Sequence, residues 1–333
     1  MLYDYGVKSR GYSYEYYNLY LPLVDIFGKE NIILYDFKSK YDELGKREMN
    51  DLFVDLVKKE TPDVCLVSLF EDEFDERSIN ALRNYTRTVN YFLDDTWRKD
   101  FVSHWIKYFD FFTTSDFYML KKYESNKALN VIYSPFGFNT SIYKKKEMPF
   151  KYDVSFVGGY SPYRKWLVEL LRKEGISVKV FGRKWGKMGT WVEQDEMVNV
   201  FNQSKINLNL SNGIIYDLKY LMWSLKSPKA MKHNLTNRKT KELVKGRHYE
   251  INACGGFQIS YFVPGLNLVY EIDKEIAVFE NERNLADQIK FYLNNDELRT
   301  EIAEAGYNRS LAEHSAQQRM KTLIETVISN PKQ

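Results

Sequence analysis

The sequence predicts an α/β protein with two domains, each built on a parallel β-sheet. Short apolar segments alternate with longer amphipathic ones, a pattern typical of strands alternating with helices. Such an alternation implies a parallel sheet covered by helices. The rhythm stops at a charged connector containing Pro149, residues 142–152, and then restarts. With 333 residues, the chain also exceeds the length at which a single core usually keeps growing.

The first domain is expected to span residues 1–145. Apolar segments bounded by turn residues predict strands at 32–37, 64–70, 88–95, 109–115 and 131–137. Amphipathic segments between them predict helices at 13–27, 46–60, 76–86, 97–107 and 116–125.

The second domain is expected to span residues 151–312. Its predicted strands are 152–159, 177–182, 205–210 and 276–281. Its predicted helices are 162–174, 193–203, 240–253, 284–294 and 296–308, and a last helix follows at 315–329.

The composition is that of a soluble globular protein, with 44% hydrophobic and 28% charged residues. A formal net charge of +3 is low for a protein that holds nucleic acid through phosphate contacts. Cys65 and Cys254 are isolated, which fits a reducing cytoplasm. No apolar run approaches the ~20 residues that cross a bilayer, so any membrane contact is expected to be peripheral. Nothing in the sequence indicates an oligomeric state.

Ligands of open α/β sheets bind at the carboxyl ends of strands, so polar residues there are the candidate binding residues. Backbone amides at a glycine pair can approach phosphate oxygens, and an arginine can donate two hydrogen bonds to a phosphate. An arginine in a first helical turn can equally be a solvated surface residue, and that alternative stays open. In the second domain the candidates are Gly158, Gly159, Arg164, Arg183, Lys184 and Asn209.

The stretch KGRHYEINACGGFQIS (245–260) raises a separate question, because it carries charges on a helix that precedes an apolar run. Arg247 and Glu250 are three residues apart and share a helix face. They can form an ion pair with each other. Alternatively, Arg247 can bind a diphosphate, while ribose hydroxyls can donate hydrogen bonds to Glu250.

This stretch and several others together resemble the glycosyltransferases related to the spore-maturation protein CgeB. The other segments that carry the likeness are YDVSFVGGYSPYRKWLVELLRKEGISVKVFGRKW, GLNLVYEIDKEIAVFEN and LADQIKFYLNNDELRTEIAEAGYNRSLAEHSAQQR. The likeness is close over residues 152–325. It extends more loosely to SRGYSYEYYN, TPDVCLVSLFEDE and VNYFLDDTWRKD in the first half.

The resemblance implies a GT-B fold, in which two Rossmann-like domains face each other across a cleft. It implies that the second domain binds a nucleotide-sugar donor, that the first binds the acceptor, and that the helix at 315–330 joins the first domain. By the same resemblance, Glu250 corresponds to the carboxylate for the donor ribose. Lys245 and Arg247 correspond to the basic pair near the diphosphate, and Gly255 and Gly256 to a glycine turn of the donor site.

Glu242 precedes Glu250 with seven residues between them, a spacing found in many retaining GT-B enzymes. The Phe-Gly-type segment expected after the first glutamate is replaced here by Leu243-Val244-Lys245. Glu242 is therefore either a catalytic candidate or an ordinary helix residue. Whether transfer inverts or retains the sugar configuration stays open.

In the first domain, carboxylates follow two predicted strands. Asp94 is the better candidate for a general base that deprotonates an acceptor hydroxyl. Asp95 is more simply explained as the cap of a helix that starts near Trp97. Glu71, Arg98 and Asp95 itself are further candidates for the acceptor side.

The acidic run FEDEFDE (70–76) offers hard oxygen ligands of the kind that Mg²⁺ prefers. In a GT-B enzyme, however, basic residues and helix N-termini can stabilise the departing diphosphate without a metal. The four histidines show no metal-ligand spacing. We therefore expect neither a metal nor another cofactor.

The sequence thus predicts a nucleotide-sugar-dependent glycosyltransferase, most simply one that uses a UDP-sugar. The expected acceptor is a hydroxyl of a polysaccharide, glycoprotein or glycolipid. One alternative is a protein that binds phosphate polymers such as nucleic acid through the basic region 212–247, which contains Lys219, Lys226, Lys229, Lys232, Arg238, Lys239 and Lys241. That region can also act as a flap over a ligand or simply keep a loop soluble. A two-domain epimerase or phosphorylase is a further alternative, since a fold does not fix a reaction.

Overall fold

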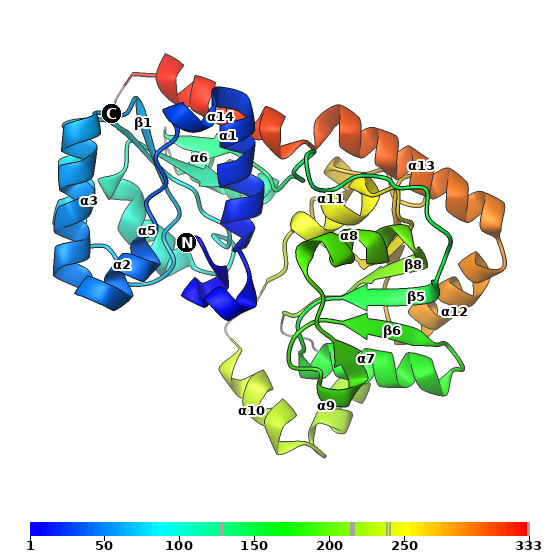
Figure 1. Cartoon of the computed structure of the whole chain (residues 1–333). Helices are drawn as coiled ribbons and strands as arrows, with labels where there is room; N and C mark the ends of the chain where they lie inside the picture. The colour runs from blue at the N-terminus through cyan, green and yellow to red at the C-terminus, as the bar shows by residue number, and fades with distance from the viewer. Residues whose placement is uncertain (127–129, 214–216, 238, 240, 332–333) are drawn as a thin grey trace. The chain divides into compact units, whose positions relative to one another are not determined.

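A computed structural model describes residues 1–126, 130–213, 217–237, 239 and 241–331 (Figure 1). The chain divides into two compact units. Unit 1 contains Met1–Asn139 and Ser315–Gln333, and unit 2 contains Thr140–His314. Arg238 and Thr240, which belong to the basic region 212–247, lie outside the described residues.

Unit 1 is built on a four-stranded parallel sheet with the order β1-β2-β3-β4. These strands are β1 (Val64–Val67), β2 (Arg87–Asn90), β3 (Phe111–Thr114) and β4 (Val131–Tyr133). The connecting helices are α3 (Lys46–Glu60), α4 (Glu76–Leu82), α5 (Lys99–Trp105) and α6 (Phe117–Ser125). The prediction of a strand–helix alternation around a parallel sheet is confirmed for this half.

Each face of this sheet is covered by its own apolar cluster. On one face, Met49, Phe53 and Ile79 of α3 and α4 pack with Phe112 of β3. On the other face, Val89 and Phe111 pack against α14 (Ala316–Ser329) through Met320, Leu323 and Val327. The last helix of the chain therefore completes the core of unit 1 together with α1 (Leu21–Phe27), as Figure 1 shows within this unit.

The strand predicted at 32–37 is wrong. Residues 32–36 form no strand, and α2 (Phe37–Leu44) begins at the expected strand end. Side chains hold this segment instead: the Tyr35 hydroxyl donates to the carbonyl of Met49 (2.7 Å), and the Asp36 carboxylate accepts from the amide of Leu2 (3.0 Å). The segment and β1 both line an apolar cavity of about 540 Å³.

Unit 2 contains a six-stranded parallel sheet with the order β10-β9-β8-β5-β6-β7. The strands are β5 (Tyr152–Val157), β6 (Val178–Phe181), β7 (Gly189–Thr190), β8 (Ser204–Asn209), β9 (Gln258–Tyr261) and β10 (Ala277–Phe279). The chain runs outward from β5 to β7 and then returns to place β8 on the other side of β5. The strand order therefore reverses between β5 and β8, and this is where open α/β sheets bind ligands.

The helices of unit 2 follow the strand–helix alternation, with two additions. They are α7 (Pro162–Lys173), α8 (Gln194–Asn202), α9 (Leu218–Ser224), α10 (Pro228–Thr236), α11 (Gly246–Ala253), α12 (Glu282–Leu293) and α13 (Asp296–Glu313). Ser161 caps α7 by accepting from the amide of Arg164 (3.3 Å), with Pro162 in the first turn. Helices α9 and α10 were not predicted from the sequence, and α11 begins six residues later than predicted.

The connector 142–152 belongs to unit 2. The amide of Lys146 donates to the Asn202 side chain (2.6 Å), whose Nδ2 donates in turn to the carbonyl of Lys144 (3.1 Å). Because both bonds go to α8, this charged segment is fixed to the second sheet's helical layer.

Candidate active site

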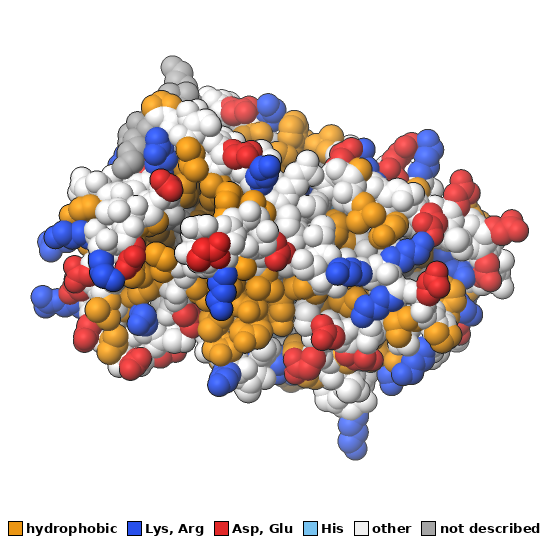
Figure 2. Space-filling model, turned by 45° about the horizontal axis from the view of Figure 1, so that its top comes forward, with side chains coloured by type: hydrophobic (Ala, Val, Ile, Leu, Met, Phe, Trp, Pro, Cys, Tyr) orange, Lys and Arg blue, Asp and Glu red, His pale blue; other side chains and the backbone are white. Residues whose placement is uncertain are grey.

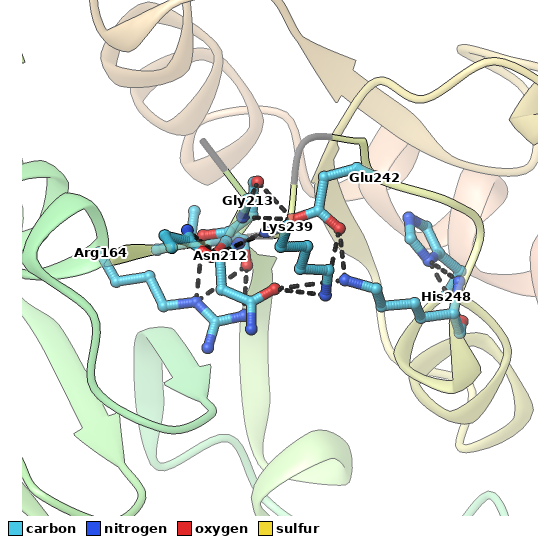
Figure 3. Close-up of polar contacts among 10 residues, drawn as sticks. Arg164, Asn212, Gly213, Lys239, Glu242 and His248 are labelled. Carbon is cyan, nitrogen blue, oxygen red and sulfur yellow. Dashed lines mark hydrogen bonds and ion pairs between the residues drawn. The ribbon is translucent and has the colours of Figure 1, made fainter. Parts of the chain in front are cut away.

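The carboxyl ends of β5 and β8 hold a cluster of polar groups drawn from several segments of unit 2 (Figure 3). Gly158 and Gly159 follow β5, and Leu210 to Gly213 follow β8. The segment that leads into α11 adds Lys239, Glu242 and Lys245. These segments are separate in the sequence, and the fold brings them together.

The glycine pair after β5 contains one packed position and one open position. A side chain on Gly158 would lie 2.6 Å from the ring of Phe156, and the Gly158 carbonyl accepts from Trp185 Nε1 (2.8 Å). Trp185 is buried, so this hydrogen bond joins the turn after β6 to the loop after β5. At Gly159, by contrast, a side chain would meet no atom within 4 Å, so its backbone faces open space.

Arg164 ties the two strand ends together. Its guanidinium donates to the carbonyls of Gly159 (2.9 Å), Leu210 (2.7 and 3.0 Å) and Ser211 (3.2 Å). Burial lowers the pKa of Arg164 to about 10. Because most of its donors are used on carbonyls, the position expected to grip a phosphate with two donors instead shapes the loop that follows β8.

Glu242 is the anchor of the cluster. Its Oε1 accepts from the Ser211 hydroxyl (2.6 Å) and from the amides of Asn212 (2.8 Å) and Gly213 (2.7 Å). Its Oε2 pairs with the ammonium groups of Lys245 and Lys239. Although burial opposes ionisation, the two lysines and the Ser211 hydroxyl lower the pKa of Glu242 to about 2. In this arrangement the Glu242 carboxylate fixes the loop that follows β8 and pairs with the amino groups of Lys239 and Lys245.

The two lysines converge on one further oxygen. Lys239 Nζ and Lys245 Nζ lie 2.9 and 3.2 Å from Asn212 Oδ1. Burial and repulsion from Lys239 lower the pKa of Lys245 to about 7, while Glu242 opposes this effect. One carboxylate thus faces two lysine amino groups, and an anion bound beside them would favour the protonated form of both.

Asn209 Nδ2, at the end of β8, and His248 Nε2 are two further buried side-chain nitrogens of unit 2. Among the described residues, neither has a hydrogen-bond partner. His248 caps α11, because its Nδ1 accepts from the amide of Lys245 (3.0 Å). Burial lowers the pKa of His248 to about 4, so the ring is neutral, and its Nδ1 also lies 3.2 Å from the carbonyl oxygen of Lys245.

Arg247 and Glu250 form an ion pair, with Arg247 Nη1 2.7 Å from Glu250 Oε2. Glu250 is 4% exposed and also contacts the buried Tyr143 hydroxyl, while the Arg247 guanidinium lies over the Phe201 ring at 5.0 Å. The structure therefore contains the Arg247–Glu250 ion pair that their spacing of three residues made possible, and the carboxylate of this pair is buried. Tyr143 lies far away in sequence and was not predicted as a neighbour.

The remaining donor-side candidates fall into two groups. Arg183 lies over the Trp191 ring at 3.7 Å, and Lys184 has a positive φ of 66°, so both belong to the turn after β6. Gly255 and Gly256 lie between α11 and β9, at the amino end of that strand, where a side chain on Gly256 would meet Asn207 Nδ2 at 2.8 Å. This corrects their expected place at the donor site. They form a tight turn at the amino ends of the strands, opposite the carboxyl ends where the cluster lies.

In unit 1, Asp95 lies at the centre of a buried polar contact. Its Oδ2 accepts from Thr114 Oγ1 (2.6 Å) and the Tyr123 hydroxyl (3.3 Å), and its buried Oδ1 has no partner within the described part of the chain. Since α5 begins at Lys99 and its N-cap residue is Arg98, the prediction that Asp95 caps this helix is wrong. Burial raises the pKa of Asp95 to about 7.

The other acceptor-side candidates lie near Arg98. The Arg98 guanidinium donates to the carbonyl of Phe70 (2.6 Å) and lies over the Phe101 ring at 3.9 Å. Asp94, which is half-buried, and the exposed Glu71 raise the pKa of Arg98, but burial lowers it more. Among the residues described, no group of three His, Cys, Asp or Glu side chains is arranged to hold a metal ion.

We expect Asp95→Asn to remove a pH-dependent destabilisation of unit 1. A carboxyl whose pKa is raised on folding favours the unfolded state progressively as pH rises from about 4 to about 7, by on the order of 4 kcal/mol. Relative to wild type, the variant should therefore have a higher free energy of unfolding at pH 8 and little advantage at pH 4. Denaturant titrations at both pH values test this, and an equal difference at the two would contradict it.

Most of the residues of this site lie in a part of the chain that matches a protein-family model. Residues 164–325 match a family model described as glycosyl transferase-like. That range contains Arg164, the loop that follows β8, Lys239, Glu242 and Lys245, whereas Gly158 and Gly159 precede it. No curated protein sequence matches the chain significantly.

Solved structures show the fold over most of the chain. Anabaena HepE in complex with UDP-glucose is 9% identical, with 93% of this chain and 95% of that one covered and a TM-score of 0.61. Sucrose-phosphate synthase from Thermosynechococcus elongatus is 11% identical, with 87% and 80% covered and a TM-score of 0.59. A glycosyltransferase from Rickettsia africae is 12% identical, with 93% and 88% covered and a TM-score of 0.58. The two parallel sheets are thus those of the two Rossmann-like domains of a GT-B fold.

Proposed function

We propose that this protein is a glycosyltransferase that moves a sugar from a nucleoside diphosphate sugar, most simply a UDP-sugar, to an acceptor hydroxyl. The family match and the fold support a transferase, and the similar HepE structure is a complex with UDP-glucose. The observation that carries the proposal is the cationic cluster at the carboxyl ends of β5 and β8, where Lys239 and Lys245 share the single carboxylate of Glu242. The resemblance to the CgeB-related enzymes points to the same activity.

The residues of this cluster take different roles in the proposed reaction. Lys239 and Lys245 bind the diphosphate, together with Asn209 Nδ2, a buried donor without a partner among the described residues. Arg164 and Glu242 are positioning residues, because their contacts hold the loop that follows β8. When the bond between the sugar and the diphosphate breaks, the electron pair goes to a phosphate oxygen, and the two ammonium groups stabilise that charge.

On the acceptor side we propose Asp94 as the general base in an inverting reaction. Its carboxylate takes the proton of the acceptor hydroxyl as the oxygen bonds to the anomeric carbon and the nucleoside diphosphate leaves. Asp95, whose carboxyl is buried, serves to fix this segment to β3 and α6. Expected acceptors are hydroxyls of a polysaccharide, glycoprotein or glycolipid, reached in the cytoplasm. In the described part of the chain, no helix is long and apolar enough to span a membrane.

Binding of the donor should not require a divalent metal. Two lysines at the cluster can supply the charge that Mg²⁺ supplies elsewhere. The affinity for a UDP-sugar, measured by calorimetry, is expected to be the same within about twofold with Mg²⁺ and with excess EDTA. Loss of binding in EDTA would contradict this role of the lysines.

The first test of the function is thermal stabilisation of the full chain by a panel of UDP-, GDP-, CMP- and dTDP-sugars. A ligand that binds only the folded state raises its stability, by about 2.7 kcal/mol at a hundredfold excess over Kd. We expect a clear rise with one nucleotide. No rise with any nucleotide at millimolar concentration would overturn the proposal.

The alternative of a phosphate-polymer binder makes a different prediction. Such a protein would present a broad basic face, but on the face in Figure 2 lysine and arginine side chains lie among aspartate and glutamate side chains. Within the basic region, Lys219 pairs with Glu282, and Lys239 and Lys245 pair with Glu242. Strong, salt-steep binding to DNA or RNA without nucleotide-sugar binding would favour this alternative over the transferase.

A further inference from the structure

The helices α9 and α10, which we call the hairpin, turn apolar side chains toward solvent. In α9 and its C-terminal flank, Leu218, Leu221, Met222 and Leu225 are 71%, 37%, 61% and 68% exposed. They follow the i, i+3, i+4, i+7 spacing that places residues on one helix face. Such a stripe normally packs into a core, so its exposure needs an explanation.

The opposite face of the hairpin is the one that packs. Tyr220 is 2% exposed and contacts the rings of Tyr163 and Trp166 on α7, and its hydroxyl donates to Asn234 Oδ1 (2.6 Å) on α10. Ala230 of α10 is also buried. Figure 1 shows both helices near α7 within unit 2. The hairpin thus packs on α7 through one face, and its apolar stripe remains exposed to solvent.

The second helix of the hairpin continues the exposed apolar surface. Met231 and Leu235 are four residues apart and are 41% and 85% exposed. Both helices are capped, since Asp217 accepts from the amide of Tyr220 (2.7 Å) and Ser227 from the amide of Ala230 (3.3 Å). The stripe is therefore presented by ordered helices.

Positive charge accompanies this apolar surface. Residues 217–237 contain four lysines and a single acidic residue, Asp217. Lys226, Lys229 and Lys232 are exposed or partly exposed, whereas Lys219 pairs with Glu282. His233 adds no charge at neutral pH, because burial lowers its pKa.

We propose that the hairpin of α9 and α10 docks unit 2 on the surface of an anionic lipid bilayer. Exposed leucine and methionine side chains beside lysines are the composition of helices that lie in a membrane interface. The apolar groups enter the interface, and the ammonium groups remain at the level of anionic headgroups. Charge complementarity selects this partner over a second copy of the chain, since an isologous contact would bring two lysine-rich faces together. The inference does not rest on the proposed transfer reaction.

Co-sedimentation of the full chain with vesicles tests this proposal. Wild type should sediment with phosphatidylcholine vesicles that contain phosphatidylglycerol, should stay in solution with phosphatidylcholine alone, and should be released by high salt. Leu225→Ser combined with Leu235→Ser should lower the partition coefficient at least tenfold. Lys226→Gln combined with Lys232→Gln should lower it roughly tenfold or more.

The matched control is Leu268→Ser combined with Leu311→Ser, which removes two leucines of unit 2 that are each 48% exposed but lie outside the hairpin. It should bind vesicles like wild type, and all variants should keep the wild-type melting temperature. Absence of wild-type binding to anionic vesicles, equal binding to neutral ones, or an equal loss in the control would overturn the proposal. A dimer in solution that the serine variant abolishes would overturn it in favour of a second copy.

Discussion

Replacing Lys245 with methionine is expected to weaken binding of a nucleoside diphosphate sugar roughly 10- to 100-fold. Hydrogen bonds to charged groups contribute about 1.5–3 kcal/mol each, and Lys245 supplies one of the two ammonium groups that face the strand ends. Methionine keeps the length and the apolar stem of the side chain. Calorimetric titration of the purified variant measures the change.

A control is needed because the single variant leaves part of the Glu242 charge unpaired. The double variant Lys245→Met/Glu242→Gln removes both charges of the pair, and the amide oxygen of the introduced glutamine can still accept from the backbone amides of Asn212 and Gly213. Its thermal stability should recover toward wild type, while its nucleotide affinity should stay low. If affinity recovers together with stability, Lys245 supports the fold and does not bind the donor.

Glu242→Ala is expected to have the largest effect on stability, about 3–5 kcal/mol in the free energy of unfolding at neutral pH. The change leaves two lysines close together and takes the acceptor from three groups of the loop that follows β8. Denaturant titration measures it. Glu271→Ala is the matched control, because Glu271 also pairs with a lysine, Lys274, but both side chains are more than half exposed. That change should cost less than about 1 kcal/mol.

The effect of Glu242→Ala should also depend on pH. A carboxylate whose pKa is lowered on folding stabilises the fold above its unfolded pKa, here 4.5, and this contribution is lost as pH falls toward the folded value of about 2. The difference between wild type and variant should therefore be full at pH 7 and shrink between pH 5 and pH 2. A difference that stays constant over this range would contradict the ion-pair account.

The sequence predicted most of the fold because its buried strands are apolar runs bounded by turns. VCLV at 64–67 is such a run, and KINLN at 205–209 alternates polar and apolar residues; both lie within strands of the structure. The segment 32–37 has the same composition but forms no strand, since Tyr35 and Asp36 are held by Met49 and Leu2. Those contacts come from distant parts of the chain, so the local pattern could not reveal them. The helices α9 and α10 escaped prediction because their apolar stripe faces solvent among lysines.

The candidate site was predictable in its location and less so in its roles. Asn209 and Gly159 lie at strand ends, as the alternation required. The Arg247–Glu250 pair could be predicted from the spacing of three residues on one helix. The role of Glu242 could not be predicted, because its partners Ser211, Asn212 and Gly213 lie about 30 residues earlier in the chain. Gly255 and Gly256 were predicted in the wrong place. A resemblance identifies corresponding residues but does not show at which end of the strands they lie.

The central claim is that the cluster around Glu242 binds the diphosphate of the donor, and comparison of UDP with uridine tests it most directly. Calorimetric titrations would use wild type and the double variant Lys245→Met/Glu242→Gln with both ligands. We expect wild type to bind UDP much more tightly than uridine, and the double variant to lose most of that difference while its affinity for uridine is unchanged. Equal affinity of wild type and the double variant for UDP would contradict the account.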